Sequence, residues 1–346
     1  MYSPDKKNLD YWKKFNSTFK KFNKIPKFKN RNVDIGLLFS KNNAEKTNTN
    51  KLEDNYIDDF NNTVSLLKEI KVNFSTYSFE SLYKMKNKPK IIIFINHEYF
   101  TQKEYSFFLN YISLGGKLIS WGKYPIFYDK GNIVLKDNKF LKNIFGVKIN
   151  STRPYFGYLS FNNQKESILS PTYGPNNFYK NLSSENIGYL FEGESMFATP
   201  DLTNLKPAIF SKKINKGKSI LFSNNISLVW DKTKSIDVIN ILKNIIFNSI
   251  DSKKSFYSNS VGQFSFYLWK KNNAFLLWLT NYSGIEQGAY CNKIQKIEIN
   301  IPKNINKIKI IENYNNSNVS INKNKTNMQI IIKNLSIWEC INFEFK

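Results

Sequence analysis

The hydrophobic residues of this chain change their spacing near residue 251, and this change constrains the fold more than any other feature. Between residues 33 and 250, short apolar runs such as KIIIFIN at 90–96 alternate with segments whose apolar residues recur every three or four positions. After residue 255 the apolar residues recur at every second position. The first pattern is typical of buried parallel strands joined by helices, and the second of antiparallel strands.

The first pattern predicts an α/β domain over residues 33–250, with a parallel sheet and helices on both of its faces. Thr101 and Glu104 have the spacing of a capping box at the start of one helix, and Gly115-Gly116 ends that helix. We expect an irregular insertion of short strands and loops near residues 150–205. The expected strands are 33–40, 73–79, 90–96, 117–121 and 217–225, and the expected helices are 56–72, 101–116 and 235–250, with a short helix running into a strand over 140–149.

The second pattern predicts a small antiparallel β-sandwich over residues 256–346, because short strands follow one another with Asn-rich turns between them. The polar residues 251–255 mark the boundary between the two domains.

Residues 1–32 form a third part, which is rich in lysine. Its aromatic residues Trp12, Phe15, Phe19 and Phe22 recur at helical spacing, so a basic amphipathic helix is predicted. Such a helix can lie on a membrane surface. An aromatic stripe more often packs on its own protein or on a partner domain, and we favour this docking role.

The chain carries 51 Lys and Arg residues against 27 Asp and Glu residues, a formal net charge of +24. A charge of this size favours an anionic partner such as nucleic acid. However, Lys, Asn and Ile are abundant together, as AT-rich codons would cause. Arg, which nucleic-acid-binding proteins use for paired contacts with bases, is scarce. We therefore expect a basic protein for which nucleic acid is the less favoured partner.

The sequence contains no apolar run long enough to span a bilayer, and its first residues, MYSPDKKNLD, have no apolar segment after their charges. We therefore expect no membrane span and a cytoplasmic location, unless a segment that exports the protein lies outside this chain.

The composition argues against several kinds of catalysis. His97 is the single histidine, and Cys291 and Cys340 both lie C-terminal to the α/β segment without C-x-x-C spacing. Multi-histidine zinc sites and cysteine nucleophiles activated by histidine both need residues that this arrangement does not supply. The G-x-S-x-G motif of serine nucleophiles does not occur either. We predict no catalytic residue, no metal site and no cofactor.

Three consecutive motifs of the α/β segment resemble a known domain. A strand ends in FINHEYFTQKE, a helix ends in YISLGGKLISWG, and FLKNIFGVKI follows. This ordered set is similar to the β-galactosidase trimerisation domain, in which Tyr-Val-x-x-Gly-Gly-x-Leu is usual. The corresponding positions here are Tyr111, Ile112, Gly115, Gly116 and Leu118.

That domain has a class I glutamine amidotransferase-like fold and lies behind the catalytic barrel in family 42-type and related glycoside hydrolases. The resemblance therefore implies a flavodoxin/amidotransferase-like parallel sheet without the barrel. Amidotransferase activity is not expected, because the α/β segment has no Cys/His pair. The C-terminal FLLWLTNYSG is similar to the β-sandwich that ends such proteins, but Trp278 stands where a histidine is usual.

Glycosidase chemistry needs two carboxylates that face each other across the scissile bond. In the resembled family these acids belong to the barrel, which has no counterpart in this sequence. The acidic residues that could take such a role have no recognisable barrel context; they are Glu98, Glu104, Asp129, Glu192, Glu194 and Asp231.

A binding site is expected at the carboxyl ends of the parallel strands, where doubly wound sheets bind their ligands. The side chains predicted there suit a sugar, because rings stack on Trp or Tyr while amides and acids bind hydroxyl groups. Each residue taken alone is more often a loop or packing residue. The candidate ligand-binding residues are Asn96, His97, Glu98, Trp121, Tyr124 and Asn224.

The sequence supports three hypotheses, in this order. The first is a non-catalytic accessory or oligomerisation protein, related to the rear domains of a glycoside hydrolase. It would make protein–protein contacts in carbohydrate metabolism, as a homo-oligomer or with a barrel-type glycosidase. The second is a carbohydrate-active enzyme or a glycan-binding protein that uses the strand-end pocket. The third is a protein that binds nucleic acid through its basic surface.

Overall fold

The computed structural model describes most of the chain in two compact units. The α/β unit comprises Asp34–Ile70 and Phe74–Asp251, and the sandwich unit comprises Met1–Val33, Lys71–Asn73 and Ser252–Lys346. No helix of the described segments is both long and apolar enough to cross a membrane. The described residues are 17, 20–28, 30–31, 33–47, 56–130, 133–154, 157–162, 167–192, 201–249, 255–283, 292–302, 305, 307–315, 317–323 and 328–345.

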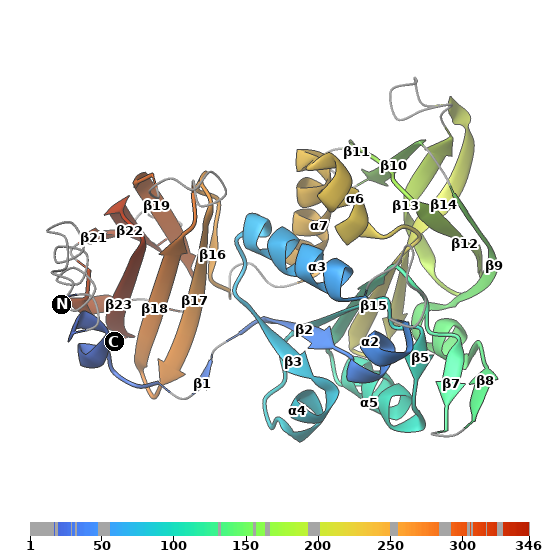
Figure 1. The fold of residues 1–346 in the computed structure, drawn as a ribbon, viewed down its shortest axis with the longest axis horizontal. Coiled ribbons are helices and arrows are strands. Elements are labelled where there is room, and N and C mark those ends of the chain that lie inside the picture. The colour runs from blue at the N-terminus through green and yellow to red at the C-terminus, as the bar shows by residue number, and fades with distance from the viewer. Residues whose placement is uncertain are drawn as a thin grey trace, which may run out of the picture. The chain divides into compact units, whose positions relative to one another are not determined.

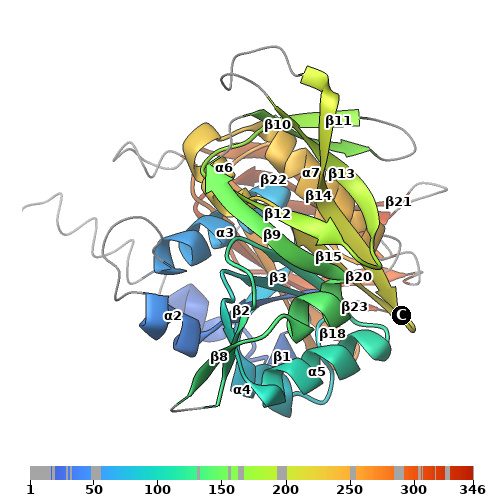
Figure 2. The same cartoon turned by 90° about the vertical axis from the view of Figure 1, so that its right-hand side faces the viewer.

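A nine-stranded sheet organises the α/β unit (Figures 1 and 2). Five of its strands are parallel and lie in the order β3-β2-β4-β6-β15. All five residues of β4 are buried, as expected for a strand that is covered on both faces. These strands lie within the segments that the sequence predicts; they are β2 (Ile35–Phe39), β3 (Phe74–Ser78), β4 (Ile91–Ile95), β6 (Lys117–Trp121) and β15 (Gly217–Phe222).

Helices lie on both faces of this sheet (Figures 1 and 2). On one side are α3 (Tyr56–Ile70), α6 (Ile226–Thr233) and α7 (Ile236–Ser249), which contact one another. On the other side α4 (Phe79–Lys84), α5 (Gln102–Ser113) and the π-helix η1 (Leu141–Phe145) share a hydrophobic core with alternate residues of the strands. The capping box of Thr101 and Glu104 is confirmed at the start of α5.

The remaining helices differ from the sequence-based expectation. Neither α4 nor α6 is predicted, and α2 (Lys41–Thr47) lies between the expected strand 33–40 and the expected helix 56–72, where the sequence predicts no element. Helices of six to eight residues complete barely two turns, so the spacing of their apolar residues is too short to recognise.

Antiparallel strands extend the parallel sheet beyond β15, so the sheet as a whole is mixed. The segment near 150–205 is therefore more regular than the sequence indicates, because distant partners rather than local residue preferences stabilise its strands. The strands that extend the sheet are β14 (Asp201–Ile214), β13 (Glu185–Glu192), β10 (Gly157–Asn162) and β11 (Ser167–Pro171). Two small sheets also form, from β9 (Val147–Pro154) with β12 (Pro175–Asn181), and from β5 (Tyr99–Phe100), β7 (Phe127–Asp129) and β8 (Val134–Lys136).

The sandwich unit contains two antiparallel sheets, of five and four strands, that contribute to one hydrophobic core. Alternate residues point into that core, such as Phe264, Phe266 and Leu268 from one sheet and Ile330 and Ile332 from the other. The first sheet has β1 (Asn30–Arg31), β17 (Phe264–Lys271), β18 (Ala274–Asn281), β23 (Trp338–Phe345) and β20 (Ile308–Asn313), and the second has β16 (Tyr257–Ser258), β19 (Ile294–Ile301), β22 (Met328–Leu335) and β21 (Asn318–Lys323).

The N-terminal segment packs on the outer side of the five-stranded sheet. Of the predicted aromatic stripe, Trp12, Phe15 and Phe19 lie outside the described residues. The ring of Phe22 stacks on Trp338 and Trp278 at centroid distances of 4.6 and 5.5 Å, and the two indole rings stack on each other at 5.3 Å. Trp278, where the resemblance leads us to expect a histidine, therefore belongs to an aromatic cluster with the N-terminal segment.

Glycine residues allow α5, β6 and β15 to approach closely where the helix ends. Gly115 follows the helix with φ +110°, a conformation that favours glycine. A Cβ atom on Gly217, the first residue of β15, would lie 2.1 Å from the carbonyl oxygen of Ile112 and 2.3 Å from that of Gly116. The Gly115-Gly116 pair is thus part of a three-element junction.

Replacement of Gly217 by alanine tests this junction. Because the new methyl group would meet backbone oxygen atoms that cannot move away independently, we expect Gly217→Ala to lower the free energy of unfolding by more than about 2 kcal/mol. Denaturant-induced unfolding measures this value. The neighbouring Lys216→Ala, at an exposed turn position, should change it by less than about 0.5 kcal/mol. Equal stability of the two variants would contradict the close approach.

Candidate functional site

The loops after β2, β4, β6 and β15 meet at one edge of the sheet, because these four strands are parallel. The predicted ligand-binding residues lie in these loops, except for Trp121, which is the last residue of β6. Asn96, His97, Trp121 and Asn224 are at most 3% exposed, whereas Glu98 and Tyr124 are half-buried.

A buried carboxylate organises one side of this edge. Asp59 lies in the first turn of α3 and is 5% exposed. One of its oxygens, Oδ2, accepts hydrogen bonds from the side-chain amides of Asn96 and Asn225, the latter at 2.8 Å. These charge-assisted bonds join α3 to the loops after β4 and β15.

The indole of Trp121 belongs to the same network. Its Nε1 donates to Ser227 Oγ at 3.2 Å, and this hydroxyl donates to Asn225 Oδ1 at 2.7 Å. The same Asn225 oxygen accepts from the backbone N–H of Leu228 and so caps α6. A fully buried tryptophan in this position serves packing and helix capping, and its ring face is not exposed for stacking on a sugar.

Asn96 has a second structural role. Its Oδ1 accepts the backbone N–H of Lys123 at 2.8 Å, and its own backbone has φ +44°. Gly122, with φ +81°, lies against it, because a Cβ atom there would lie 1.9 Å from Asn96 Oδ1. The amide of Asn96 therefore holds the loop after β6 in place.

His97 points to the other side of the sheet, toward α5. Its ring packs edge-on against Phe94 and Phe108, and Nδ1 lies 3.4 Å from the side-chain amide of Asn43. Its Nε2 lies 3.6 Å from the Glu104 carboxylate. Burial lowers the pKa of His97, and the negative charge of Glu104 opposes this shift only in part. The ring is therefore held in its neutral form.

The other three predicted residues lie apart from this network. The backbone oxygen of Glu98 accepts the N–H groups of Ile126 and Phe127. The hydroxyl of Tyr124 lies 3.3 Å from Thr152 Oγ1 on β9. Asn224 is buried, and both atoms of its side-chain amide lack a hydrogen-bond partner among the described residues.

The structure thus brings Asn96 and Trp121 into one network and places His97 on the opposite side of the sheet. The predicted site residues do not include Asp59, Asn225 and Ser227, which complete the network, although the sequence places Asn225 at a strand end. A signal for Asp59 is present, because it occupies the helical stripe that also contains the buried residues Tyr56 and Thr63. A carboxylate on the buried face of a helix needs a partner.

The acidic candidates for a catalytic role also have structural contacts. Glu104 accepts from the backbone and side chain of Thr101 in the capping box. Asp129 lies 2.6 Å from Lys46 Nζ and accepts from Asn42, while Asp231 pairs with Lys232 and Lys234. Glu194 and the side chain of Glu192 lie outside the described residues. In the described part of the chain, no three His, Cys, Asp or Glu side chains gather as a metal site requires.

Comparison of the whole fold with solved structures gives similarity to glycoside hydrolases. An α-L-fucosidase isoenzyme 2 from Paenibacillus thiaminolyticus matches with a TM-score of 0.67 and 12% identity over 91% of this chain and 49% of that one. A GH42 β-galactosidase from G. stearothermophilus matches with a TM-score of 0.66 and 11% identity over 99% and 45%, respectively. A β-galactosidase from Bacillus circulans sp. alkalophilus gives 0.62 and 11% over 90% and 41%.

These likenesses show that the chain has a glycoside hydrolase-related fold. The chain spans less than half the length of each of these enzymes. No protein-family profile matches the sequence, and no curated protein is detectably similar to it.

Removal of the Asp59 carboxylate should destabilise the α/β unit. Asp59→Ala leaves two buried amide groups without their acceptor, and each buried unpaired group costs about 1–3 kcal/mol. We expect a loss of more than about 2 kcal/mol of unfolding free energy in denaturant titration. Asp58→Ala, at the exposed neighbouring position of the same helix turn, is the matched control and should be nearly neutral. A neutral Asp59→Ala variant would show that the network is not required.

His97 gives a prediction for the pH dependence of stability. Because its pKa is lower in the folded state than in the unfolded chain, the unfolded state binds the proton more readily. The His97 contribution is fully present above about pH 6.5 and is lost as the pH falls below this value, by at most about 1.4 kcal/mol per pH unit.

NMR can check this directly, because the chain has a single histidine and therefore one imidazole Cε1–H resonance. We expect a titration midpoint below 6.5. The loss of stability between pH 7 and pH 5 should be smaller in His97→Gln than in the unchanged protein. A midpoint above 6.5 would mean that the Glu104 carboxylate outweighs burial.

Proposed function

We propose that this protein is a non-catalytic accessory or oligomerisation protein in carbohydrate metabolism, related to the rear domains of a glycoside hydrolase. The fold carries this proposal, because almost the whole chain superposes on less than half of a GH42 β-galactosidase. We further propose that the α/β unit corresponds to the trimerisation domain of such enzymes and that the catalytic barrel has no counterpart here.

The strand order supports the finer fold assignment within this proposal. Numbered by their position in the chain, the five parallel strands lie in the order 2-1-3-4-5, which is the flavodoxin-like order. The classification as a flavodoxin/amidotransferase-like sheet is therefore part of the proposal.

The contacts at the strand ends support a structural rather than a catalytic role for this edge. Asp59 receives two amide groups, and Glu104 caps a helix and lies beside a neutral histidine. A carboxylate that acts as a general acid or base must reach the substrate. Glycan binding through Glu98, Tyr124 and the other strand-end residues, nucleic-acid binding and a cytoplasmic location stay predictions.

The proposed partner is a second copy of this chain or a barrel-type glycosidase. Three exposed apolar residues, Ile133, Val134 and Leu135, follow one another at β8, which forms one edge of its small sheet. Exposed apolar edge strands favour association with other chains.

Size-exclusion chromatography with light scattering tests the proposal. We expect a mass that is a multiple of the chain mass, or a complex when a family 42-type barrel protein is added. The double variant Val134→Lys/Leu135→Lys should shift the protein toward the monomer, whereas Val261→Lys, at a 91% exposed position of the sandwich unit, should not. A monomer at every concentration that also forms no complex with the barrel protein would contradict the accessory role.

A further inference from the structure

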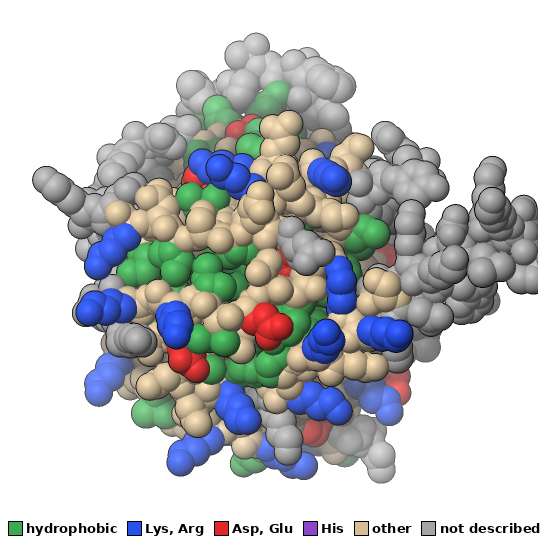
Figure 3. Space-filling view, turned by 90° about the vertical axis from the view of Figure 1, so that its left-hand side faces the viewer, with side chains coloured by type: hydrophobic (Ala, Val, Ile, Leu, Met, Phe, Trp, Pro, Cys, Tyr) green, Lys and Arg blue, Asp and Glu red, His purple; other side chains and the backbone are tan. Residues whose placement is uncertain are grey.

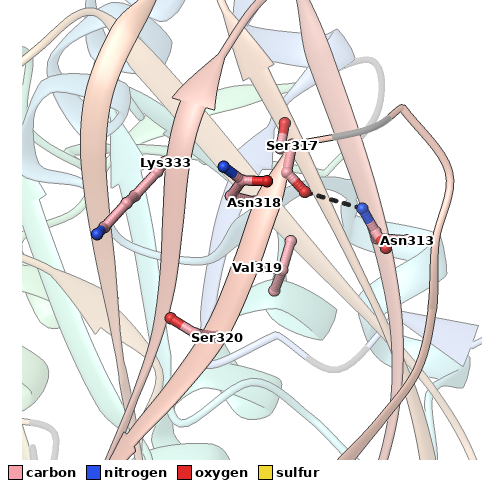
Figure 4. A pocket seen from close by; sticks show the side chains of 6 residues that line it. All are labelled: Asn313, Ser317, Asn318, Val319, Ser320 and Lys333. Atoms are coloured by element: carbon pink, nitrogen blue, oxygen red, sulfur yellow. Dashed lines mark hydrogen bonds between the residues drawn. The ribbon is translucent and has the colours of Figure 1, made fainter.

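A polar groove of about 580 Å³ lies in the sandwich unit along β21, and the last residue of β20 and one residue of β22 also line it (Figure 4). β20 and β21 are each the last described strand of their sheet. The volume of the groove is within the range of small-molecule binding sites. The residues that line it are Asn313, Ser317, Asn318, Val319, Ser320 and Lys333.

A buried carboxylate fixes one wall of this groove. Glu339 on β23 is 0% exposed, and its carboxylate accepts the backbone N–H groups of Tyr314, Asn315 and Ser317 at 2.8–2.9 Å. Burial of an anion is costly unless hydrogen bonds compensate for the lost water. These bonds tie Tyr314, Asn315 and Ser317 to β23, and the Asn313 side chain donates to the Ser317 carbonyl (Figure 4).

The side chains along the groove offer a defined set of polar groups. Asn318 and Lys333 are exposed and lie directly opposite each other on the paired strands β21 and β22, and Ser320 is two residues further along β21. Figure 4 shows Asn318, Ser320 and Lys333 projecting to the same side of these strands. Five of the six lining residues supply amides, hydroxyls and one ammonium group, the sixth is Val319, and none of the six is acidic.

This set matches an acidic sugar better than a neutral one. Amide and hydroxyl groups exchange hydrogen bonds with sugar hydroxyls, and an ammonium group binds a carboxylate through a charge-assisted bond. We propose that this groove binds a uronic acid-containing oligosaccharide, with Lys333 on the carboxylate and Asn318 with Ser320 on the ring hydroxyls. The proposal rests on the carbohydrate-related function proposed above and adds a ligand class and a site.

The basic surface of the protein sets a condition for the experiment. Figure 3 shows Lys and Arg side chains spread around one face of the molecule, and the net charge of the chain is +24. Such a surface attracts any polyanion without a specific site. The test must therefore separate groove binding from this general attraction.

Isothermal titration calorimetry with tri-galacturonate makes this separation. We expect the unchanged protein to bind it. Lys333→Gln should weaken binding by about tenfold or more, the effect of losing a hydrogen bond to a charged group, and Asn318→Ala by about two- to tenfold, the effect of losing a neutral one. Lys309→Gln removes another exposed lysine, on β20 but outside the groove lining, and should change the affinity by less than about twofold.

Two further probes distinguish charge from sugar recognition. A triglutamate peptide has the same charge as tri-galacturonate without its hydroxyl groups, and galactotriose has the hydroxyl groups without the charge. Both should bind at least about tenfold more weakly than tri-galacturonate. The melting temperature of each variant shows whether it remains folded, and surface substitutions at these exposed positions should leave it unchanged.

Several results would overturn the site. They are no binding of tri-galacturonate, equal weakening by Lys333→Gln and Lys309→Gln, or binding of triglutamate as tight as that of the sugar. The accessory or oligomerisation role is tested separately, by light scattering. Loss of tri-galacturonate binding in Lys333→Gln with unchanged association in light scattering would confirm the groove independently of the oligomeric role.

Discussion

The α/β unit depends on one buried carboxylate at the edge where its parallel strands end. Asp59 receives the amide groups of Asn96 and Asn225, and so joins α3 to the loops after β4 and β15. A buried anion without such donors would cost several kcal/mol, so these bonds are a condition for the packing of the helix on the sheet. The two amides that bind this carboxylate stabilise the fold, and for this reason we propose a structural role for this edge of the sheet.

The sandwich unit also contains a buried carboxylate with several hydrogen-bond donors, but its donors are of a different kind. Glu339 is buried and receives backbone N–H groups rather than side-chain amides. The side chains of Asn318 and Lys333, which lie opposite each other on β21 and β22, are exposed and do not take part in this compensation. A buried acid is therefore bonded to side-chain amides in one unit and to backbone N–H groups in the other.

Local patterns in the sequence are sufficient to predict the five parallel strands and the three longest helices of the α/β unit. The Thr101–Glu104 capping box is an example, because its two residues are three positions apart in the chain. The five apolar residues of β4 form a continuous run that marks a strand buried on both faces, although its pairing partners β2 and β6 are distant in the chain. The long strand β14 is not predictable in this way, because it is stabilised by pairing with β13 and β15. The sequence predicts that the site lies at the ends of the parallel strands, but it does not predict which side chains meet there. Asn96 and His97 are neighbours in the chain, yet they point to opposite sides of the sheet.

The sequence by itself determined the class of the fold, the positions of the strand ends and the lack of a Cys/His pair in the α/β segment, since these follow from local periodicity and composition. Only the tertiary structure decided that Trp121 and Asn96 are buried and hydrogen-bonded. Their network runs through Asp59 and Asn225, which are separated by 166 positions in the chain. Such contacts leave no local pattern, because they arise only when distant segments pack against one another.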